Sequence, residues 1–106
     1  MTYKEFCKNE LGYECKTMFW DDFTIADAFG EKGIRDTYKR AFEEWKTNTE
    51  YITEFVMVLN HKCNIWYDKG NEEYSRIYQE LYEQADAWCM DNLQGDDLNY
   101  FLQTTD

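Results

Sequence analysis

The stretch TNTEYITEFVMVLNHKCNIWYDKG (residues 47–70) decides the fold. Thr47 and Glu50 fit the capping box that opens a helix, and Gly70 is a typical residue just past a helix end. Between them, apolar residues recur at steps of three and four, at Ile52, Phe55, Val56, Leu59, Cys63 and Trp66, with Tyr51, Val58 and Ile65 widening the stripe. So broad an apolar arc predicts the central helix of an all-α protein.

Two further long helices are predicted beside it, over residues 33–46 and residues 72–94. The apolar stripe of the first is Ile34, Tyr38, Ala41, Phe42 and Trp45. The stripe of the second is Tyr74, Ile77, Tyr78, Leu81, Ala85, Trp88, Cys89 and Asn92. Asn71 is a good N-cap for this second helix, and Gly95 is predicted to end it.

Shorter helices are predicted at residues 2–9, at 21–30 and after Asp96, a candidate N-cap. Thr24 and Asp27 form a pair similar to a capping box near the start of the second of these. The sequence therefore predicts one all-α domain over residues 1–106, with residues 1–16 as a variable N-terminal extension. Its architecture is a compact bundle of three long antiparallel helices with short helices at both ends.

The chain carries 22 acidic and 11 basic residues, a net charge of −11. An excess of this size argues against nucleic acid or an anionic membrane as a direct partner. No apolar run approaches the roughly 20 residues of a membrane span. The first residues, MTYKEF, contain no apolar signal core, so we expect a cytoplasmic protein.

The negative charge is concentrated towards the C-terminus, because residues 77–106 contain seven acids and no Lys or Arg. On a helical wheel, six acids of the segment 72–94 fall within an arc of roughly 140°, opposite the apolar stripe. We call these six and the next two acids along the chain the acidic ridge: Glu72, Glu73, Glu80, Glu83, Asp86, Asp91, Asp96 and Asp97. From Glu72 to Asp91 it extends about 28 Å.

The predicted helix over residues 33–46 differs, because four bases in it or directly before it gather on one edge, at Lys32, Arg35, Lys39 and Lys46. This distribution predicts a bipolar molecule. The acidic ridge has two interpretations: a solvated helix face, or a surface that meets a basic protein by imitating the charge of a nucleic-acid backbone. Met57, Tyr67 and Tyr82 fall outside the apolar stripes and are candidate anchors for such a partner.

No residue pattern predicts catalysis, and the phosphate-binding, dinucleotide-binding and metalloprotease motifs are missing from the sequence. The single histidine, His61, could form a dyad with Glu54, but an exposed histidine is the favoured interpretation. Cys7, Cys15, Cys63 and Cys89 contain no C-x-x-C pair, which favours core thiols over a zinc site. We therefore expect no enzyme, no catalytic residue, no metal and no cofactor.

Four strings resemble a family of small acidic proteins carried on conjugative and other mobile elements of Gram-positive gut bacteria. They are FWDDFTIADAFG (19–30), AFEEWKTN (41–48), TEFVMVLNHK (53–62) and DNLQGDDLNYFLQTTD (91–106). The resemblance implies a protein-binding inhibitor of a host defence nuclease, of anti-CRISPR or anti-restriction type. Its acidic ridge would occupy a basic nucleic-acid-binding groove of a Cas nuclease or restriction complex. The alternative is a structural or regulatory accessory or adaptor protein of a conjugative element, as a homodimer.

Overall fold

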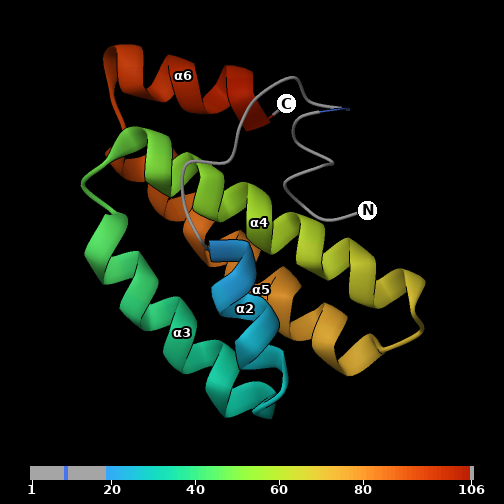
Figure 1. The fold of residues 1–106 in the computed structure, drawn as a ribbon. Helices are drawn as coiled ribbons and strands as arrows, with labels where there is room; N and C mark the ends of the chain where they lie inside the picture. Colours follow the sequence, from blue (N-terminus) through green and yellow to red (C-terminus); the bar gives the residue numbers. More distant parts are fainter. Residues whose placement is uncertain (1–8, 10–18, 106) are drawn as a thin grey trace.

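The computed structural model describes residue 9 and residues 19–105, and these residues form helices without any strand. The helices are α2 (Phe19–Asp27), α3 (Gly30–Trp45), α4 (Thr49–Asp68), α5 (Glu72–Asn92) and α6 (Gly95–Thr105), as Figure 1 shows. The all-helical prediction is therefore confirmed for this part of the chain. Apart from Asn9, the helix predicted at residues 2–9 lies outside it.

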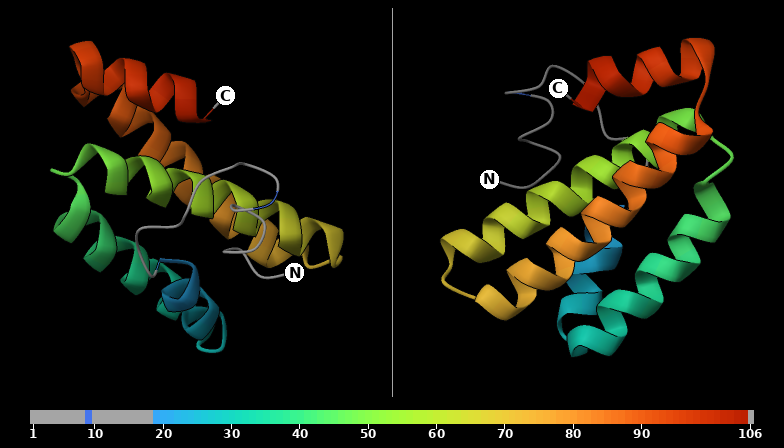
Figure 2. Two further views of the ribbon diagram at one scale, coloured as in Figure 1. Left: turned by 45° about the horizontal axis from the view of Figure 1, so that its top comes forward. Right: turned by 180° about the vertical axis from the view of Figure 1, so that it is seen from behind.

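Helix α4 occupies the centre. It shares its most extensive interface with α5, and the two helices lie side by side in every view of Figures 1 and 2. It also contacts α2, α3 and α6. Its fully buried apolar side chains are Ile52, Phe55, Val56, Val58 and Leu59. Burial of each contributes about 1.5–3 kcal/mol, so the arc predicted from the sequence supplies much of the core.

The boundaries of α4 differ by one feature from the prediction. The N-cap is Asn48, whose Oδ1 accepts a hydrogen bond from the Tyr51 N–H at 3.1 Å, so the capping box at Thr47 is wrong. Asn48 has extended backbone and its short side chain reaches the first free N–H groups of the helix. The predicted end is confirmed, because Gly70 follows with a φ of +80°.

The N-terminus of α5 is also as predicted, since Asn71 Oδ1 accepts a hydrogen bond from the Tyr74 N–H at 3.0 Å. Its C-terminus is not. Helix α5 ends at Asn92, and Gly95, with a φ of +59°, begins α6 instead of ending α5. Helix α6 packs mainly on α4 and buries Phe101.

Helices α2 and α3 meet at a tight corner. Helix α3 begins at Gly30, three residues earlier than predicted, and α2 begins at Phe19. A Cβ at Gly33 would lie 2.6 Å from Phe29 Cβ and 2.9 Å from the Ala26 carbonyl oxygen. Glycine is therefore required at Gly33 by close approach of the two helices. Thr24 lies inside α2 and is not a cap.

Aromatic side chains join α3 to the α4–α5 pair. The Phe42 ring contacts Trp88 edge-on, with centroids 5.3 Å apart, and Tyr38 contacts Phe55 at the same distance. Ile34 and Ala41 complete the buried stripe. Three ion pairs lie along α3: Lys32 pairs with Asp36, Arg35 with Glu31 and Lys46 with Glu43. Among the described residues, no helix is long and apolar enough to cross a membrane.

Candidate functional site

The acidic ridge lies along the outer face of α5 and continues into the first turn of α6. Seven of its eight members are exposed: Glu72, Glu73, Glu80, Glu83, Asp91, Asp96 and Asp97. Asp86 is half-buried, and burial raises the pKa of its carboxyl group. The buried residues of α5, such as Ile77, Leu81 and Ala85, occupy the opposite face. The predicted separation of ridge and core on one helix is thus present.

Most of the ridge has no cationic partner in the part of the chain that the structure describes. Within residues 19–105, no Lys or Arg forms an ion pair with Glu72, Glu73, Glu83, Asp91, Asp96 or Asp97. The one base within the arc, Arg76, is itself exposed. Carboxylates of like sign along one helix repel one another and hold a negative potential over that face. The face is therefore suited to a positively charged surface.

Glu80 is the exception, because α3 neutralises it. The Arg35 guanidinium lies 2.5 Å from Glu80 and 2.8 Å from Glu31, and hydrogen bonds to these carboxylates raise the pKa of Arg35. The basic edge of α3 therefore reaches the ridge, so the predicted bipolar charge distribution is wrong at this point. Both side chains are more than a third exposed, so the pair contributes about 0–1 kcal/mol.

The three candidate anchors have different surroundings. Tyr67, near the end of α4, is 71% exposed. Tyr82 on α5 is half-buried and packs against the core. Its pKa is raised, mainly by burial and then by the negative charges of Asp86 and Glu83. Met57 is also half-buried. Only Tyr67 therefore offers a whole ring to a partner.

A groove separates the second half of α4 from the first half of α5, beside the acidic ridge. It has a volume of about 360 Å³. Its lining residues are Asn60, Cys63, Asn64, Tyr67, Ser75, Gln79, Tyr82 and Glu83. Two candidate anchors and one ridge carboxylate thus meet in a single hollow. The sequence did not predict this, because a helical wheel describes one helix and the groove needs two.

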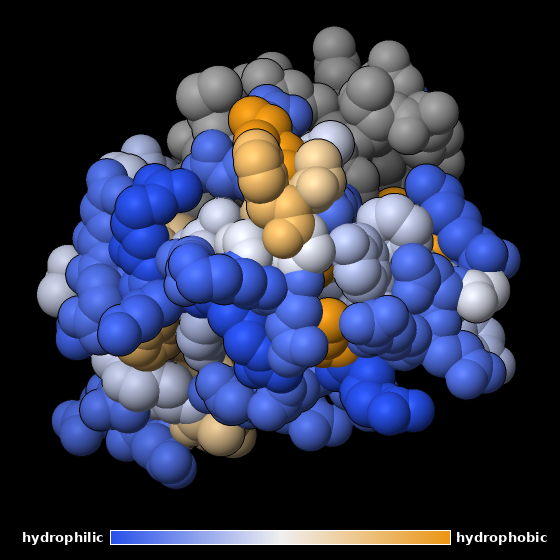
Figure 3. Space-filling view, turned by 90° about the horizontal axis from the view of Figure 1, so that it is seen from below, coloured by the Kyte–Doolittle hydropathy of each residue, from blue (hydrophilic) through white to orange (hydrophobic). Residues whose placement is uncertain are grey.

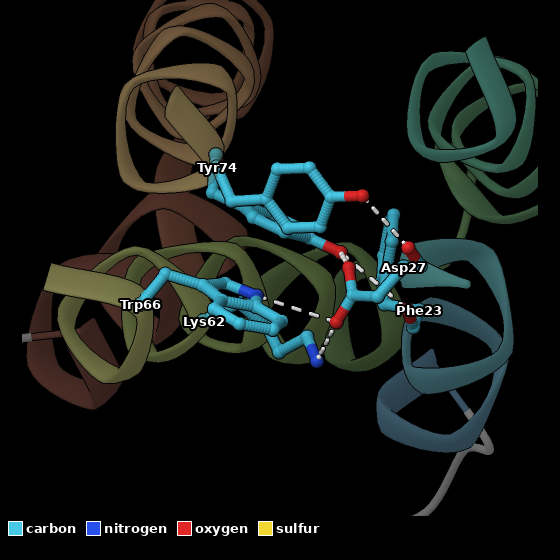
Figure 4. A network of polar contacts seen from close by, with 6 residues as sticks. Phe23, Asp27, Lys62, Trp66 and Tyr74 are labelled. Carbon is cyan, nitrogen blue, oxygen red and sulfur yellow. Dashed lines mark hydrogen bonds and ion pairs between the residues drawn. The ribbon is translucent and has the colours of Figure 1, made fainter. Parts of the chain in front are cut away.

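A buried polar network joins α2 to α4 and α5 (Figure 4). The Asp27 carboxylate accepts hydrogen bonds from Lys62 Nζ at 2.5 Å, from Trp66 Nε1 at 3.3 Å and from the Tyr78 hydroxyl. The Tyr74 hydroxyl donates to the Asp27 carbonyl oxygen at 2.9 Å. The side chains of Lys62 and Asp27 are 5% and 10% exposed, so this ion pair is desolvated. Burial, and then the bond to Asp27, raises the pKa of Tyr78.

The sequence pattern predicts Asp27 only as part of a helix cap and does not predict this network. A signal was present: Lys62 falls on the α4 wheel between Val58 and Phe55, inside the apolar arc. A buried base requires an acidic partner, because an unpaired charge in the core is costly. The network fixes α2 against the α4–α5 pair and is a structural element.

The sequence favours an exposed His61 over a dyad of His61 with Glu54, and the structure gives both residues a different setting. Glu54 is buried, at 5% exposure, and His61 is half-buried rather than exposed. Burial, and then the charge of Lys62, lowers the pKa of His61.

The two described cysteines lie within the α4–α5 pair. Cys89 is fully buried and burial raises its pKa to about 12, while the Cys63 Sγ atom lies 3.5 Å from Ser75 Oγ. Cys7 and Cys15 lie outside the described residues. In the described part of the chain, no group of three His, Cys, Asp or Glu residues is placed to hold a metal ion.

Comparison of the chain with protein-family models, with curated proteins and with solved structures found no match.

Proposed function

We propose that this protein is a protein-binding antagonist whose acidic ridge occupies a basic, nucleic-acid-binding groove of a host defence nuclease. One observation carries the proposal: six ridge carboxylates are exposed and have no cationic partner among the described residues. In this proposal α3, α4 and α5 act as a bundle of three long antiparallel helices that holds the ridge on its outer face. The protein acts in the cytoplasm, is encoded by a mobile element and performs no catalysis.

Charge density favours one kind of groove over another. Four of the unpaired carboxylates, Glu72, Glu73, Glu83 and Asp91, span the roughly 28 Å of α5, and Asp96 and Asp97 extend them. A DNA duplex of that length carries about 16 phosphates, and a single strand about 8. The ridge is therefore closer in charge to one phosphate strand than to a duplex. The groove that it fits best tracks a single strand.

Electrostatic capture of this kind has a measurable signature. Long-range attraction accelerates association, and added salt weakens it as the screening length shortens. Binding of the chain to a Cas nuclease and to a restriction complex is to be measured by interferometry in about 50 mM and about 500 mM NaCl. We expect binding at low salt that weakens strongly at high salt.

The decisive variant is the triple charge reversal Glu72→Lys, Glu83→Lys and Asp91→Lys. These sites are exposed, so the fold tolerates the change, and Glu80 is left intact because it contacts Arg35. The matched control reverses three exposed acids elsewhere, Asp21, Asp36 and Glu44.

We expect the ridge variant to lose at least about tenfold in affinity, and the control, of equal net charge, less than about twofold. No binding at low salt, or equal losses in the two variants, contradicts the proposal.

A second candidate function is an accessory or adaptor protein of a conjugative element, acting as a homodimer. It is favoured by Ile25 and Phe29, which are 63% and 74% exposed on α2 and the turn after it. Figure 3 shows hydrophobic side chains gathered in a patch on a mostly hydrophilic face. Sedimentation at several concentrations of the wild type and of the double variant Ile25→Ser/Phe29→Ser tests this function. A wild-type dimer that dissociates in the double variant supports the adaptor. A monomeric wild type at every concentration contradicts the homodimer.

A further inference from the structure

The groove between α4 and α5 has a lining that selects for charge. Glu83 supplies one carboxylate to its lining, and among the described residues no Lys or Arg lines it. Three amides, Asn60, Asn64 and Gln79, add carbonyl oxygens as further acceptors. This composition disfavours an anion, which would find no positive charge, and an apolar ligand, which would desolvate the amides.

Two of the lining residues, Cys63 and Ser75, already form hydrogen bonds with each other. Ser75 Oγ donates to the Cys63 carbonyl oxygen at 3.0 Å, and the Cys63 Sγ atom lies 3.5 Å from the same hydroxyl. The other lining residues are therefore the ones left to bind a ligand. Gln79 Nε2 lies 3.3 Å from Glu83 Oε1, which places an amide and a carboxylate together on the α5 side.

Two tyrosines line the groove as well. Tyr67 comes from the second half of α4 and is largely exposed, whereas Tyr82 comes from α5 and is half-buried. Phenol rings attract cations through their faces, and a planar cation can stack on them. A guanidinium group is planar, presents five N–H donors and is weakly hydrated, so it suits a carboxylate, amide carbonyls and rings better than an ammonium does.

We propose that this groove is a binding site for the guanidinium group of an arginine side chain from a protein partner. The charge of Glu83, the amide acceptors and the exposed Tyr67 ring provide the recognition. The biological role of this site rests on the proposed function, because the partner that binds the acidic ridge would insert one arginine into the groove beside the ridge. The chemistry of the site is testable without that partner.

The test is a ¹H–¹⁵N titration of the full chain with N-acetyl-L-argininamide, with N-acetyl-L-citrullinamide as the neutral isostere. We expect a dissociation constant in the range of about 1–10 mM for argininamide, as is reasonable for a single side chain. The side-chain amide signals of Asn60, Asn64 and Gln79 should shift. Citrullinamide should bind at least about tenfold more weakly, because it lacks the charge.

Two variants locate the site. Glu83→Gln should weaken argininamide binding at least about fivefold, and Tyr67→Ala about two- to fivefold. The matched control, Glu72→Gln, removes one exposed ridge carboxylate that does not line the groove and should leave binding unchanged. The inference is overturned if argininamide does not bind, or if citrullinamide binds equally well. It is also overturned if Glu83→Gln and Glu72→Gln have equal effects, or if the signals that shift all belong to residues outside the groove.

The inference and the proposed function fail separately. If argininamide does not bind but the triple reversal on the ridge still abolishes nuclease binding, only the groove inference is overturned. If argininamide binds in the groove but no nuclease is captured at low salt, the site stands and the proposed function is contradicted.

Discussion

Removal of Lys62 isolates the effect of the buried ion pair on stability. Lys62→Met keeps the length of the side chain but leaves the Asp27 carboxylate, 10% exposed, without its counter-ion. Trp66 and Tyr78 still donate to that carboxylate, so two of its three side-chain hydrogen bonds survive while its charge is uncompensated. Breaking a buried pair from one side costs about 3–5 kcal/mol. Small domains have only about 5–15 kcal/mol in total, so a large part of the stability is lost.

Urea unfolding followed by tryptophan fluorescence measures this cost. With a slope of about 2 kcal/mol per molar urea, the midpoint should fall by about 1.5–2.5 M. The matched control is Lys32→Met, which breaks the exposed Lys32–Asp36 pair, whose side chains are 89% and 66% exposed. That change should cost less than about 0.5 kcal/mol.

The double substitution Asp27→Asn/Lys62→Met separates pairing from packing. Because no charge is then left unpaired, it should cost less than Lys62→Met alone, even though two residues have changed. The reasoning is refuted if the double variant loses the sum of the losses of Asp27→Asn and Lys62→Met, within about 0.5 kcal/mol. It is also refuted if Lys62→Met alone costs less than about 1 kcal/mol.

Three further outcomes are expected. Cys89 should resist a thiol reagent in the native chain and react only in denaturant, because it is fully buried and burial raises its pKa to about 12; mass spectrometry of labelled peptides checks this. Gly33→Ala should destabilise the protein by about 1–3 kcal/mol in thermal unfolding despite its better helix propensity, because the new Cβ would lie 2.6 Å from Phe29 Cβ. Burial raises the pKa of Tyr38 to about 12, so the folded state holds the phenol proton more tightly than the unfolded state does. The stability that this proton contributes is complete below about pH 10 and is lost towards pH 12. In urea unfolding across that range, Tyr38→Phe should therefore lose less stability than the wild type.

The fold was predictable where a signal is local. The stripe of α4 and the caps at Gly70 and Asn71 depend on residues within a few positions of each other, so the sequence predicts them directly. Gly95 was misassigned because a glycine most often marks the end of a helix, whereas here α5 already ends at Asn92 and Gly95, with positive φ, begins α6. The choice of Asn48 over Thr47 as the N-cap was similarly a difference of one residue between two good capping types.

The site was less predictable because it depends on pairs far apart in the chain. The outward face of α5 follows from its periodicity, but the contact of Glu80 with Arg35 spans 45 positions and that of Asp27 with Lys62 spans 35. Periodicity describes one helix at a time, so it cannot say which neighbouring helix neutralises an acid. The groove likewise becomes visible only once α4 and α5 are placed together.

The short connection between α4 and α5 has a consequence for the order in which the chain folds. These two helices share the most extensive interface, and only residues 69–71 separate them. Closing so short a loop costs little chain entropy, and contacts between sequence neighbours form quickly. The hairpin is therefore the expected folding nucleus, onto which α2, α3 and α6 dock later. Substitutions at Leu59 and Leu81 should then slow refolding, whereas Lys62→Met should chiefly accelerate unfolding.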